Sequence, residues 1–554
     1  MKSSLTDFSS TPQESSPPYA ANLEVDVLIV GAGFSGIFCL HKVRKQGLSA
    51  VIYEAGKGIG GTWQWNCYPG AMVDSEVPVY QFSIPETWQD WTWSSNYPDY
   101  KELRAYFDHV DKVLEISKDC AFGSVVVGAH FNHDEVRWHI STADGRTARA
   151  KYLIVAAGFS AKRYIPDWEG LDRFQGVIHH SSFWPEKEVD VHGKRCAVIG
   201  TGASGVQLTQ AWGPVADSVR VFQRTPNLTL PMRRRLLSRE EQEQSKAFYP
   251  DLFCLRERTF GGFLYTFVEK TLDQDSEEEQ QAFLEKLWEA GGFRFWLQNY
   301  KDYLFDAKTN RVVYDFWAKK VRQGIDDPRK RDILAPLVPH HHFGIKRPAL
   351  QNNYYEQFNR PTVDVVNIKE NPIVGLTKTG IQLQDGTVHE VDIIGLATGF
   401  DAVTGGITEM GIQSIHGSTL KDDWKAAART YLGLTVSGYP NMFNVYGTHG
   451  PTLLSNGPTA VEIQCQWVVD AIKQMERQGI KYLDATEEAS QQWKAHIDEL
   501  SNETLLPTTR STYMGSSILG KAFEQTCYAG GMFPYTEEIR AVLPTFKGFR
   551  IVRG

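Results

Sequence analysis

The chain carries one pattern twice: a nearly continuous apolar run that ends in a glycine-rich turn and leads into a helical segment. The first copy spans residues 25–36 (VDVLIVGAGFSG) and the second spans residues 194–205 (KRCAVIGTGASG). Continuous apolar runs are typical of parallel strands buried on both faces, and a glycine turn between strand and helix lets the backbone approach a pyrophosphate. The repeat therefore predicts an α/β protein with two doubly wound, Rossmann-like dinucleotide-binding domains.

The first unit has a carboxylate at the position expected for ribose recognition. A second apolar strand, SAVIYE, ends at Glu54, which follows Gly36 by 18 residues. An acid about 20 residues beyond such a turn can accept hydrogen bonds from ribose hydroxyls. We therefore expect a dinucleotide here, and a close-packed turn without a ligand is the alternative. The turn residues expected to hold it are Gly31, Gly33, Ser35 and Gly36.

The second unit differs from the first at this acidic position. Counted from the first glycine of each turn, Gln223 takes the place of Glu54, and Arg224 follows it. Losing the acid removes repulsion toward a 2′-phosphate, and a guanidinium can bind that phosphate in a forked arrangement. The first unit therefore suits FAD and the second suits NADPH over NADH, unless Arg224 is only a solvated residue at a strand end. The turn residues of the second unit are Gly200, Thr201, Gly202, Ala203, Ser204, Gly205 and Val206.

Two similar strand ends suggest that the second unit is inserted within the first. Residues 151–160 (KYLIVAAGFS) and residues 390–401 (EVDIIGLATGFD) both run from a buried strand into small residues. We expect an FAD domain of residues 22–160 and 390–554 and an NADP domain of residues 161–389. Within the latter, residues 232–340 are predicted to be a charged helical insertion. The Ser/Pro-rich residues 1–21 are predicted to be a disordered tail.

Composition excludes several classes of function. The net charge is −8 and no basic block stands out, which argues against a nucleic-acid or membrane partner. No apolar run reaches 18 residues, and the seven cysteines never form a C-x-x-C pair, which indicates a soluble, cytoplasmic protein without a dithiol centre. Three consecutive histidines (340–342) cannot all point one way in regular structure, so no metal site is predicted. The oligomeric state is not indicated.

The connector between the two units resembles a known family fingerprint. Residues 174–185 (FQGVIHHSSFWP) fit the F-x-G-x-x-x-H-x-x-x-W-P pattern of Baeyer–Villiger monooxygenases. The motifs GGTWQWNCYPG, FQRTP, KRP and ATGFD occur in the order of that family, so the chain from about residue 21 to its end is similar to a type I member. The fingerprint residues, which we interpret as a hinge and packing clasp, are Phe174, Gly176, His180, Trp184 and Pro185.

The resemblance implies roles for individual residues. On the sequence alone Lys346 and Arg347 are ordinary surface charges, whereas the resemblance makes Arg347 the active-site arginine and Asp74 its acidic neighbour. The positions that match FAD contacts are Ser35, Glu54, Thr62, Trp63, Gln64, Trp65, Asp74, Tyr80 and Val126. The positions that match NADP contacts are Met72, Val73, residues 200–206, Arg224, Thr225, Lys346 and Arg347.

The implied activity is insertion of one oxygen from O₂ beside a ketone carbonyl, which gives an ester or lactone. NADPH would reduce FAD, and a C4a-peroxyflavin kept anionic beside Arg347 would attack the small-molecule ketone. A heteroatom-oxidising or N-hydroxylating flavin monooxygenase is the alternative within enzymes. A catalytically silent flavoprotein that responds to NADPH is the alternative of another class.

One segment departs from the family pattern. Residues 511–521 (STYMGSSILGK) resemble S-W-x-x-G-A-N-x-P-G-K, but Thr512 replaces the tryptophan, Ser516-Ser517 replaces Ala-Asn and Leu519 replaces proline. We expect a wider or reshaped substrate pocket and an altered hold on NADP⁺. Residues 448–450 and 456–457 are expected to line the same region, with turn structure as the alternative.

Overall fold

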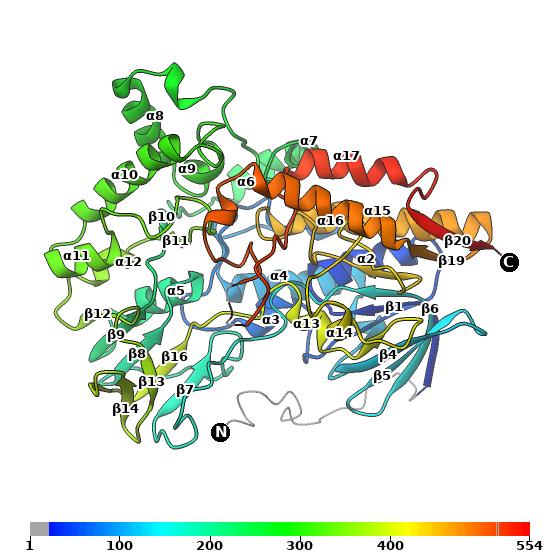
Figure 1. Cartoon of the computed structure of the whole chain (residues 1–554), viewed down its shortest axis with the longest axis horizontal. Coiled ribbons are helices and arrows are strands. Elements are labelled where there is room, and N and C mark those ends of the chain that lie inside the picture. The colour runs from blue at the N-terminus through cyan, green and yellow to red at the C-terminus, as the bar shows by residue number, and fades with distance from the viewer. Residues whose placement is uncertain (1–21, 517, 519, 554) are drawn as a thin grey trace.

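The computed structural model describes residues 22–516, 518 and 520–553. Within these residues two α/β units lie side by side, and a helical subdomain covers one of them (Figure 1). This is the predicted doubly wound architecture. The tail predicted for residues 1–21 lies outside the described residues, as do Ser517 and Leu519 of the departing segment.

The first unit is built on an eight-stranded mixed sheet. The strands follow the order β17-β4-β5-β6-β1-β2-β3, and β18 also pairs with β6. β1 lies parallel to both β2 and β6, which places its carboxyl end and the glycine turn that follows in the middle of the sheet. The strands are β1 (Asn22–Val30), β2 (Ala50–Tyr53), β3 (Cys120–Ala121), β4 (Val126–Asn132), β5 (Arg137–Thr142), β6 (Thr147–Val155), β17 (Ile412–Gln413) and β18 (Met442–Asn444).

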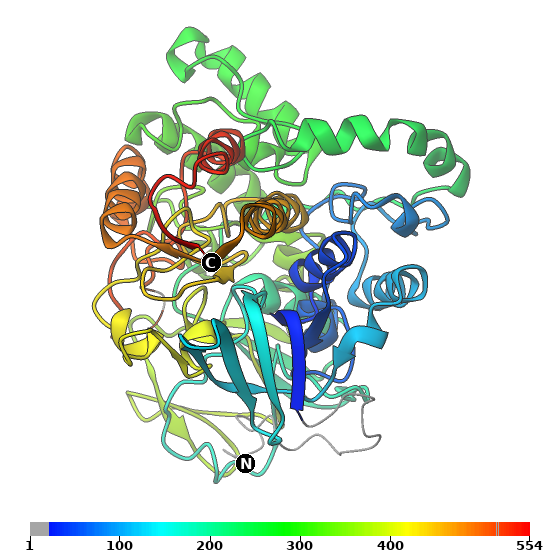
Figure 2. The same cartoon turned by 90° about the vertical axis from the view of Figure 1, so that its right-hand side faces the viewer.

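Helices from both ends of the chain cover one face of this sheet. α2 packs against α15 above the blue and cyan strands, as Figure 2 shows. Alternate β1 residues Val27 and Ile29 are fully buried beneath these helices, while Leu28 is buried in the cluster on the opposite face. The helices of this unit are α2 (Phe34–Arg44), α3 (Thr62–Trp65), α4 (Tyr100–Leu114), α13 (Gly405–Thr408), α14 (Leu420–Asp423), α15 (Gly457–Gln478), α16 (Glu487–Asn502) and α17 (Met532–Val542). A separate antiparallel pair joins β19 (Ile480–Ala485), which follows α15, to β20 (Phe549–Arg553) near the C-terminus.

The second unit is a five-stranded parallel sheet in the order β12-β9-β8-β16-β7. α5 (Ala203–Trp212) packs on β8 and β9, and a small antiparallel sheet shares a core cluster with the same strands. The strands are β7 (Val177–His180), β8 (Arg195–Ile199), β9 (Ser218–Gln223), β12 (Val363–Asn367) and β16 (Ile393–Leu396), with β13 (Ile373–Leu376), β14 (Gly380–Leu383) and β15 (Val388–Glu390) in the small sheet.

A helical subdomain, green in Figure 1, follows β9; its helices α6 to α11 lie within residues 232–340, whereas β10, β11 and α12 lie outside those bounds. Two short strands, β10 and β11, pair in parallel at its entrance and exit. The elements are β10 (Leu230–Pro231), α6 (Arg239–Ser245), α7 (Tyr249–Arg256), α8 (Glu277–Ala290), α9 (Arg294–Leu297), α10 (Ala307–Gln323), α11 (Pro328–Leu334), β11 (Leu350–Gln351) and α12 (Tyr354–Gln357).

The strand β16 bears on the predicted domain boundary. It pairs with β7 and β8, so it completes the second sheet instead of opening the second half of the first unit. We therefore propose that the chain returns to the first unit near residue 397 and not at residue 390.

Among the described helices, none combines the length and apolar composition that crossing a bilayer requires.

Candidate active site

Both glycine turns have the same geometry. A Cβ added at Gly36 would lie 1.8 Å from the carbonyl oxygen of Gly31, and one added at Gly205 would lie 2.0 Å from the carbonyl oxygen of Gly200. Only glycine permits this contact between helix and turn. The first turns of α2 and α5 therefore present unpaired backbone N–H groups beside a strand end, where a pyrophosphate fits. Gly33 borders a second loop, since its Cα lies against Gly61 at the start of α3.

The carboxylate of Glu54 is held at the end of β2 by two backbone amides. It accepts from Ala32 N at 2.7 Å and from Gly56 N at 2.6 Å, and only 4% of the residue is exposed. Burial raises its pKa, and the two amide hydrogen bonds oppose that rise. Each oxygen keeps a second lone pair, so the group can still accept from a ribose hydroxyl. The site thus fits the adenosine end of FAD.

The segment after this strand forms an aromatic wall. Arg104 on α4 donates to the carbonyl oxygens of Trp63 and Gln64, at 3.0 and 2.5 Å, and so fixes α3. Trp63 Nε1 donates to the Tyr80 hydroxyl at 3.1 Å. Trp65 stacks on Phe183 of the connector. Thr62 opens α3, and Val126 lies farther off, in the core cluster on the other face of the sheet.

The second turn is linked to the segment that carries Asp74. Gln207 of α5 donates to the carbonyl oxygen of Met72 at 3.0 Å and accepts from the Tyr68 hydroxyl at 2.6 Å. Ser204 Oγ donates to the same tyrosine at 3.1 Å. Met72 therefore contacts the second unit, with Val73 next to it in the chain; their NADP contacts stay a prediction.

Two cations stand beside the second turn. Gln223, which replaces the acid, is buried and donates to the carbonyl oxygen of Ile333 at 2.7 Å, so the exposed side chain at the end of β9 is Arg224. Thr201 Oγ1 fixes the following residue by donating to the carbonyl oxygen of Thr225 at 2.8 Å. Burial and the nearby charge of Arg224 lower the pKa of Lys346 to about 8. Two cations held close together favour an anion between them, as a 2′-phosphate would be.

This pKa predicts a pH dependence of coenzyme binding. Lys346 is charged below about pH 8 and loses its charge as the pH rises through that value, so attraction for a 2′-phosphate weakens on the alkaline side. We expect the KM for NADPH to rise by up to about tenfold between pH 7 and pH 9. NADH, which lacks that phosphate, is the control. A Lys346→Met variant should bind NADPH weakly at both pH values, and an equal rise for both coenzymes in the wild type would contradict this role.

Arg347 and Asp74 form a bidentate ion pair. Nε donates to Oδ2 and Nη2 to Oδ1, both at 2.8 Å. Nη1 donates to the carbonyl oxygens of Leu453 and Ser455, at 2.9 and 3.3 Å. The guanidinium also lies over the ring of Phe293, 4.7 Å from its centroid. Burial lowers the pKa of Arg347, but the charge and hydrogen bonds of Asp74 outweigh this and leave it above its ordinary value.

The pair is deep in the molecule and yet open on one side. Arg347 lies deep among other residues, yet 25% of its side chain and 31% of that of Asp74 remain accessible. This accessible surface leaves room for a ligand against the ion pair. One N–H of Nη2 has no partner within the described part of the chain. A fixed cation with a free donor can stabilise negative charge that develops on a reacting oxygen.

The fingerprint connector supplies β7 to the edge of the second sheet and then contacts the residues that follow β16. His180 is fully buried, with Nε2 3.2 Å from the carbonyl oxygen of Gly399 and Nδ1 3.0 Å from Ser182 Oγ. Burial lowers its pKa to about 4, so it is neutral near pH 7. Trp184 packs against Trp212 of α5, and Gly176 leaves room for the carbonyl oxygen of Asp392. This geometry supports the hinge and clasp interpretation. Phe174, at the start of the connector, is buried in the core cluster of the second unit, and Pro185 follows Trp184.

Several neighbours of the ion pair were missed by sequence reasoning. The carbonyls of Leu453 and Ser455 belong to the loop before α15, and no motif singles them out. Tyr446 is close enough to affect the charges of the pair, as is Tyr513, and both are buried. The expected lining residues of that loop are buried too: His449 bonds Thr430, and Asn456 donates to the carbonyl oxygen of Val79 at 3.1 Å.

The departing segment brings a different side chain to this region. Thr512 uses its carbonyl oxygen to accept from Thr526 Oγ1 at 3.1 Å. Its neighbour Tyr513 is 2% exposed and lies beside the ion pair, with no hydrogen-bond partner for its hydroxyl among the described residues. The aromatic ring that this segment contributes is therefore one residue further along than in the family pattern. A pattern comparison at position 512 alone could not show this.

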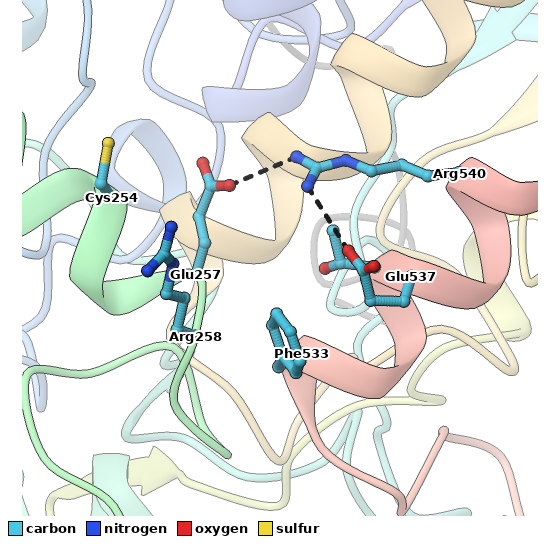
Figure 3. A pocket seen from close by; sticks show the side chains of 7 residues that line it. Cys254, Glu257, Arg258, Phe533, Glu537 and Arg540 are labelled. Atoms are coloured by element: carbon cyan, nitrogen blue, oxygen red, sulfur yellow. Dashed lines mark hydrogen bonds and ion pairs between the residues drawn. The ribbon is translucent and has the colours of Figure 1, made fainter.

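A separate surface groove of about 440 Å³ lies between α7 and α17 (Figure 3). One ion pair crosses the groove, since Arg540 of α17 lies 3.4 Å from Glu257 after α7, and Arg540 also lies 3.9 Å from Glu537 of its own helix. None of the predicted site residues lines it. The groove therefore does not alter the location of the candidate site.

Within the described residues, no group of three potential metal ligands occurs.

Comparison with known proteins identifies the class of molecule. Residues 25–247 match the family described as pyridine nucleotide-disulphide oxidoreductase. The FAD-binding monooxygenase acrE of Aspergillus aculeatus is 60% identical over 100% of this chain and 93% of its own length. Cyclopentanone 1,2-monooxygenase of Comamonas sp. is 40% identical over 93% of this chain and 94% of its own length.

The solved structures agree. Cyclohexanone monooxygenase from Rhodococcus sp. Phi1, bound to NADP⁺, superposes with a TM-score of 0.92 at 34% identity and covers 97% of this chain and 100% of that chain. The two nucleotide turns, the cation pair beside the second turn and the Arg347–Asp74 pair all fit FAD and NADPH. The chain belongs to the FAD- and NADPH-dependent Baeyer–Villiger monooxygenases.

Proposed function

We propose that Arg347 and Asp74 are the reacting centre at which this enzyme converts a ketone and O₂ to an ester or lactone. The observation that carries the proposal is the bidentate pair itself, which lies deep in the molecule while 25% of the Arg347 side chain and 31% of the Asp74 side chain stay accessible. FAD held by Glu54 and the first glycine turn would supply the capacity to accept a hydride from NADPH and to activate O₂. What the chain supplies is a fixed positive charge, a free N–H donor and a site shielded from bulk water.

Asp74 acts on the reaction through Arg347. Its two oxygens fix the plane of the guanidinium, and the carbonyls of Leu453 and Ser455 fix the remaining edge. The cation is therefore preorganised, and it needs no rotation when negative charge develops on the ketone oxygen. Phe293 beneath the guanidinium keeps water from one face.

The other site residues divide between the two cofactors. We propose that Glu54 and the first turn hold the adenosine and pyrophosphate of FAD, and that Tyr80 and α3 border its ring. Arg224 and Lys346 hold the 2′-phosphate of NADPH. His180 and Trp184 tie the connector to both units while these cofactors react. The cytoplasmic location predicted from the scattered cysteines stays a prediction.

Product analysis tests the proposed function. Purified enzyme with FAD, NADPH and O₂ is given matched panels of ketones, sulfides and amines, and products are identified by mass spectrometry. We expect ketone-dependent NADPH oxidation with stoichiometric ester or lactone. N-oxides or N-hydroxylated products with no ester would favour the heteroatom-oxidising alternative. NADPH oxidation that stays at background with every compound would favour the silent flavoprotein.

A further inference from the structure

A second arginine–carboxylate pair lies beside the first. Arg294 Nη1 donates to Glu76 Oε1 at 2.5 Å. Glu76 is two residues after Asp74, and Arg294 directly follows Phe293, whose ring lies under the Arg347 guanidinium. Phe293 therefore links the two pairs, and both Arg294 and Arg347 are close enough to Tyr265 for their charges to act on its phenol.

This second pair keeps unused hydrogen-bonding capacity. Glu76 Oε1 also accepts from the Tyr97 hydroxyl at 3.0 Å, whereas Oε2 has no partner in the part of the chain that the structure describes. Nε and Nη2 of Arg294 likewise have no hydrogen-bond partner among the residues that the structure describes. Each of the two charged side chains keeps 28% of its surface accessible. The pair thus presents a free donor and a free acceptor side by side.

Tyr265 completes this group. The Arg294 guanidinium lies 4.7 Å from the centroid of its ring, and the ring stacks on Phe263 with centroids 5.5 Å apart. Protein surrounds the phenol, yet the residue keeps accessible surface. Burial raises the pKa of Tyr265, so its hydroxyl keeps a proton at any working pH and can donate it. The Phe293 backbone acts on the phenol and opposes part of that rise in pKa.

We infer that Arg294, Glu76 and Tyr265 form a polar subsite that binds a hydroxyl group carried by the ketone substrate. A hydroxyl suits the group because it can donate to Glu76 Oε2 while it accepts from Arg294 or Tyr265. A carboxylate fits less well, since Glu76 already neutralises Arg294 and would repel a second anion. An alkyl group would displace water from these donors and the acceptor and leave them unpaired. The free energy lost in this way exceeds the free energy gained from the apolar contact. The inference rests on the proposed ketone oxidation.

The experiment compares ketones that differ only by hydroxyl and methyl. The ring pair is 4-hydroxycyclohexanone and 4-methylcyclohexanone, and the linear pair is 5-hydroxy-2-pentanone and 2-hexanone. We expect the wild-type enzyme to favour the hydroxylated member in kcat/KM by about tenfold, on the scale of one net hydrogen bond at a partly accessible site. In Tyr265→Phe and in Glu76→Gln this ratio should fall toward one.

A matched control removes another phenol from the same helical subdomain. The Tyr300 hydroxyl donates to Asp275 at 2.6 Å, away from the two pairs, so Tyr300→Phe should keep the wild-type ratio. Flavin content and circular dichroism show that each variant is folded. The ratio of kcat/KM for the two substrates is not affected by a general loss of activity. Because Tyr265→Phe and Glu76→Gln alter different atoms, either variant can serve as the test if the other does not fold.

The outcomes separate this inference from the proposed function. Oxidation of the methyl compounds without a preference for the hydroxylated ones in wild type would overturn the polar subsite and leave ketone oxidation intact. A preference that survives in both Tyr265→Phe and Glu76→Gln would also overturn it. If no ketone is oxidised at all, the proposed function fails first. A wild-type preference lost in both variants and kept in Tyr300→Phe supports the subsite.

Discussion

Arg347→Ala is expected to lower ester formation by about a thousandfold while NADPH still bleaches the bound flavin. The guanidinium supplies the fixed charge that faces the developing negative charge, and removing one such preorganised donor costs about 3–4 kcal/mol of transition-state stabilisation. NADPH binding depends mainly on the second turn and its cations, so flavin reduction should continue. The measurement combines stopped-flow absorbance of the flavin with quantification of the ester.

Arg347→Lys serves as the matched variant. Lysine keeps the charge but lacks the planar fork that pairs with both oxygens of Asp74, so its activity should lie between those of wild type and Arg347→Ala. Ester formation near the wild-type rate in Arg347→Ala would remove this residue from the mechanism. Loss of flavin bleaching as large as the loss of ester would show that the change had damaged coenzyme binding instead.

Asp74→Asn is expected to lower kcat/KM for a ketone by about a hundredfold, or about 2.7 kcal/mol. Asparagine keeps the shape of the side chain, but its amide cannot accept two charge-assisted hydrogen bonds from the fork. The guanidinium then loses its fixed plane, and one of its N–H groups faces another donor. NADPH oxidation that continues while hydrogen peroxide replaces ester is the expected signature.

An exposed pair provides the control for this change. Glu289 lies 2.9 Å from Arg233 on the helical subdomain, with 59% and 46% of the two side chains accessible. Exposed pairs contribute at most about 1 kcal/mol, so Glu289→Gln should leave both rate and coupling unchanged. Wild-type coupling in Asp74→Asn would show that Arg347 is held without the carboxylate.

The strands could be predicted because a strand buried on both faces requires an unbroken run of apolar residues. Both glycine turns could be predicted because the close approach of two backbone segments requires glycine. Glu54 was predictable from its spacing, and the structure adds the two amides that hold it. The motif KRP located Arg347, but only the family resemblance separated it from surface charge. The end of the inserted unit was less predictable, because β16 is equally apolar whichever sheet it joins.

The surroundings of the ion pair could not be predicted, because they come from contacts distant in sequence. The carbonyl of Leu453 reaches Arg347 from 106 positions away. Leu453 and Tyr446 have φ angles of +70° and +58°, a region that side chains other than glycine rarely adopt. Tertiary packing imposes this loop conformation, and its strain at the site is not encoded in local composition. The pairing of Arg294 with Glu76 is likewise visible only after the helical subdomain has folded onto the first unit.

The central claim is that an oxygen atom from O₂ enters the bond beside a ketone carbonyl next to Arg347. The most direct measurement is turnover of a ketone with NADPH under isotopically heavy dioxygen, followed by mass spectrometry of the product. The account predicts an ester or lactone that carries one heavy oxygen atom in its ring or chain, formed by wild type and nearly absent with Arg347→Ala. Two results would contradict this prediction. One is an unchanged ketone together with hydrogen peroxide formed in an amount equal to the NADPH oxidised, and the other is a product that carries no heavy oxygen.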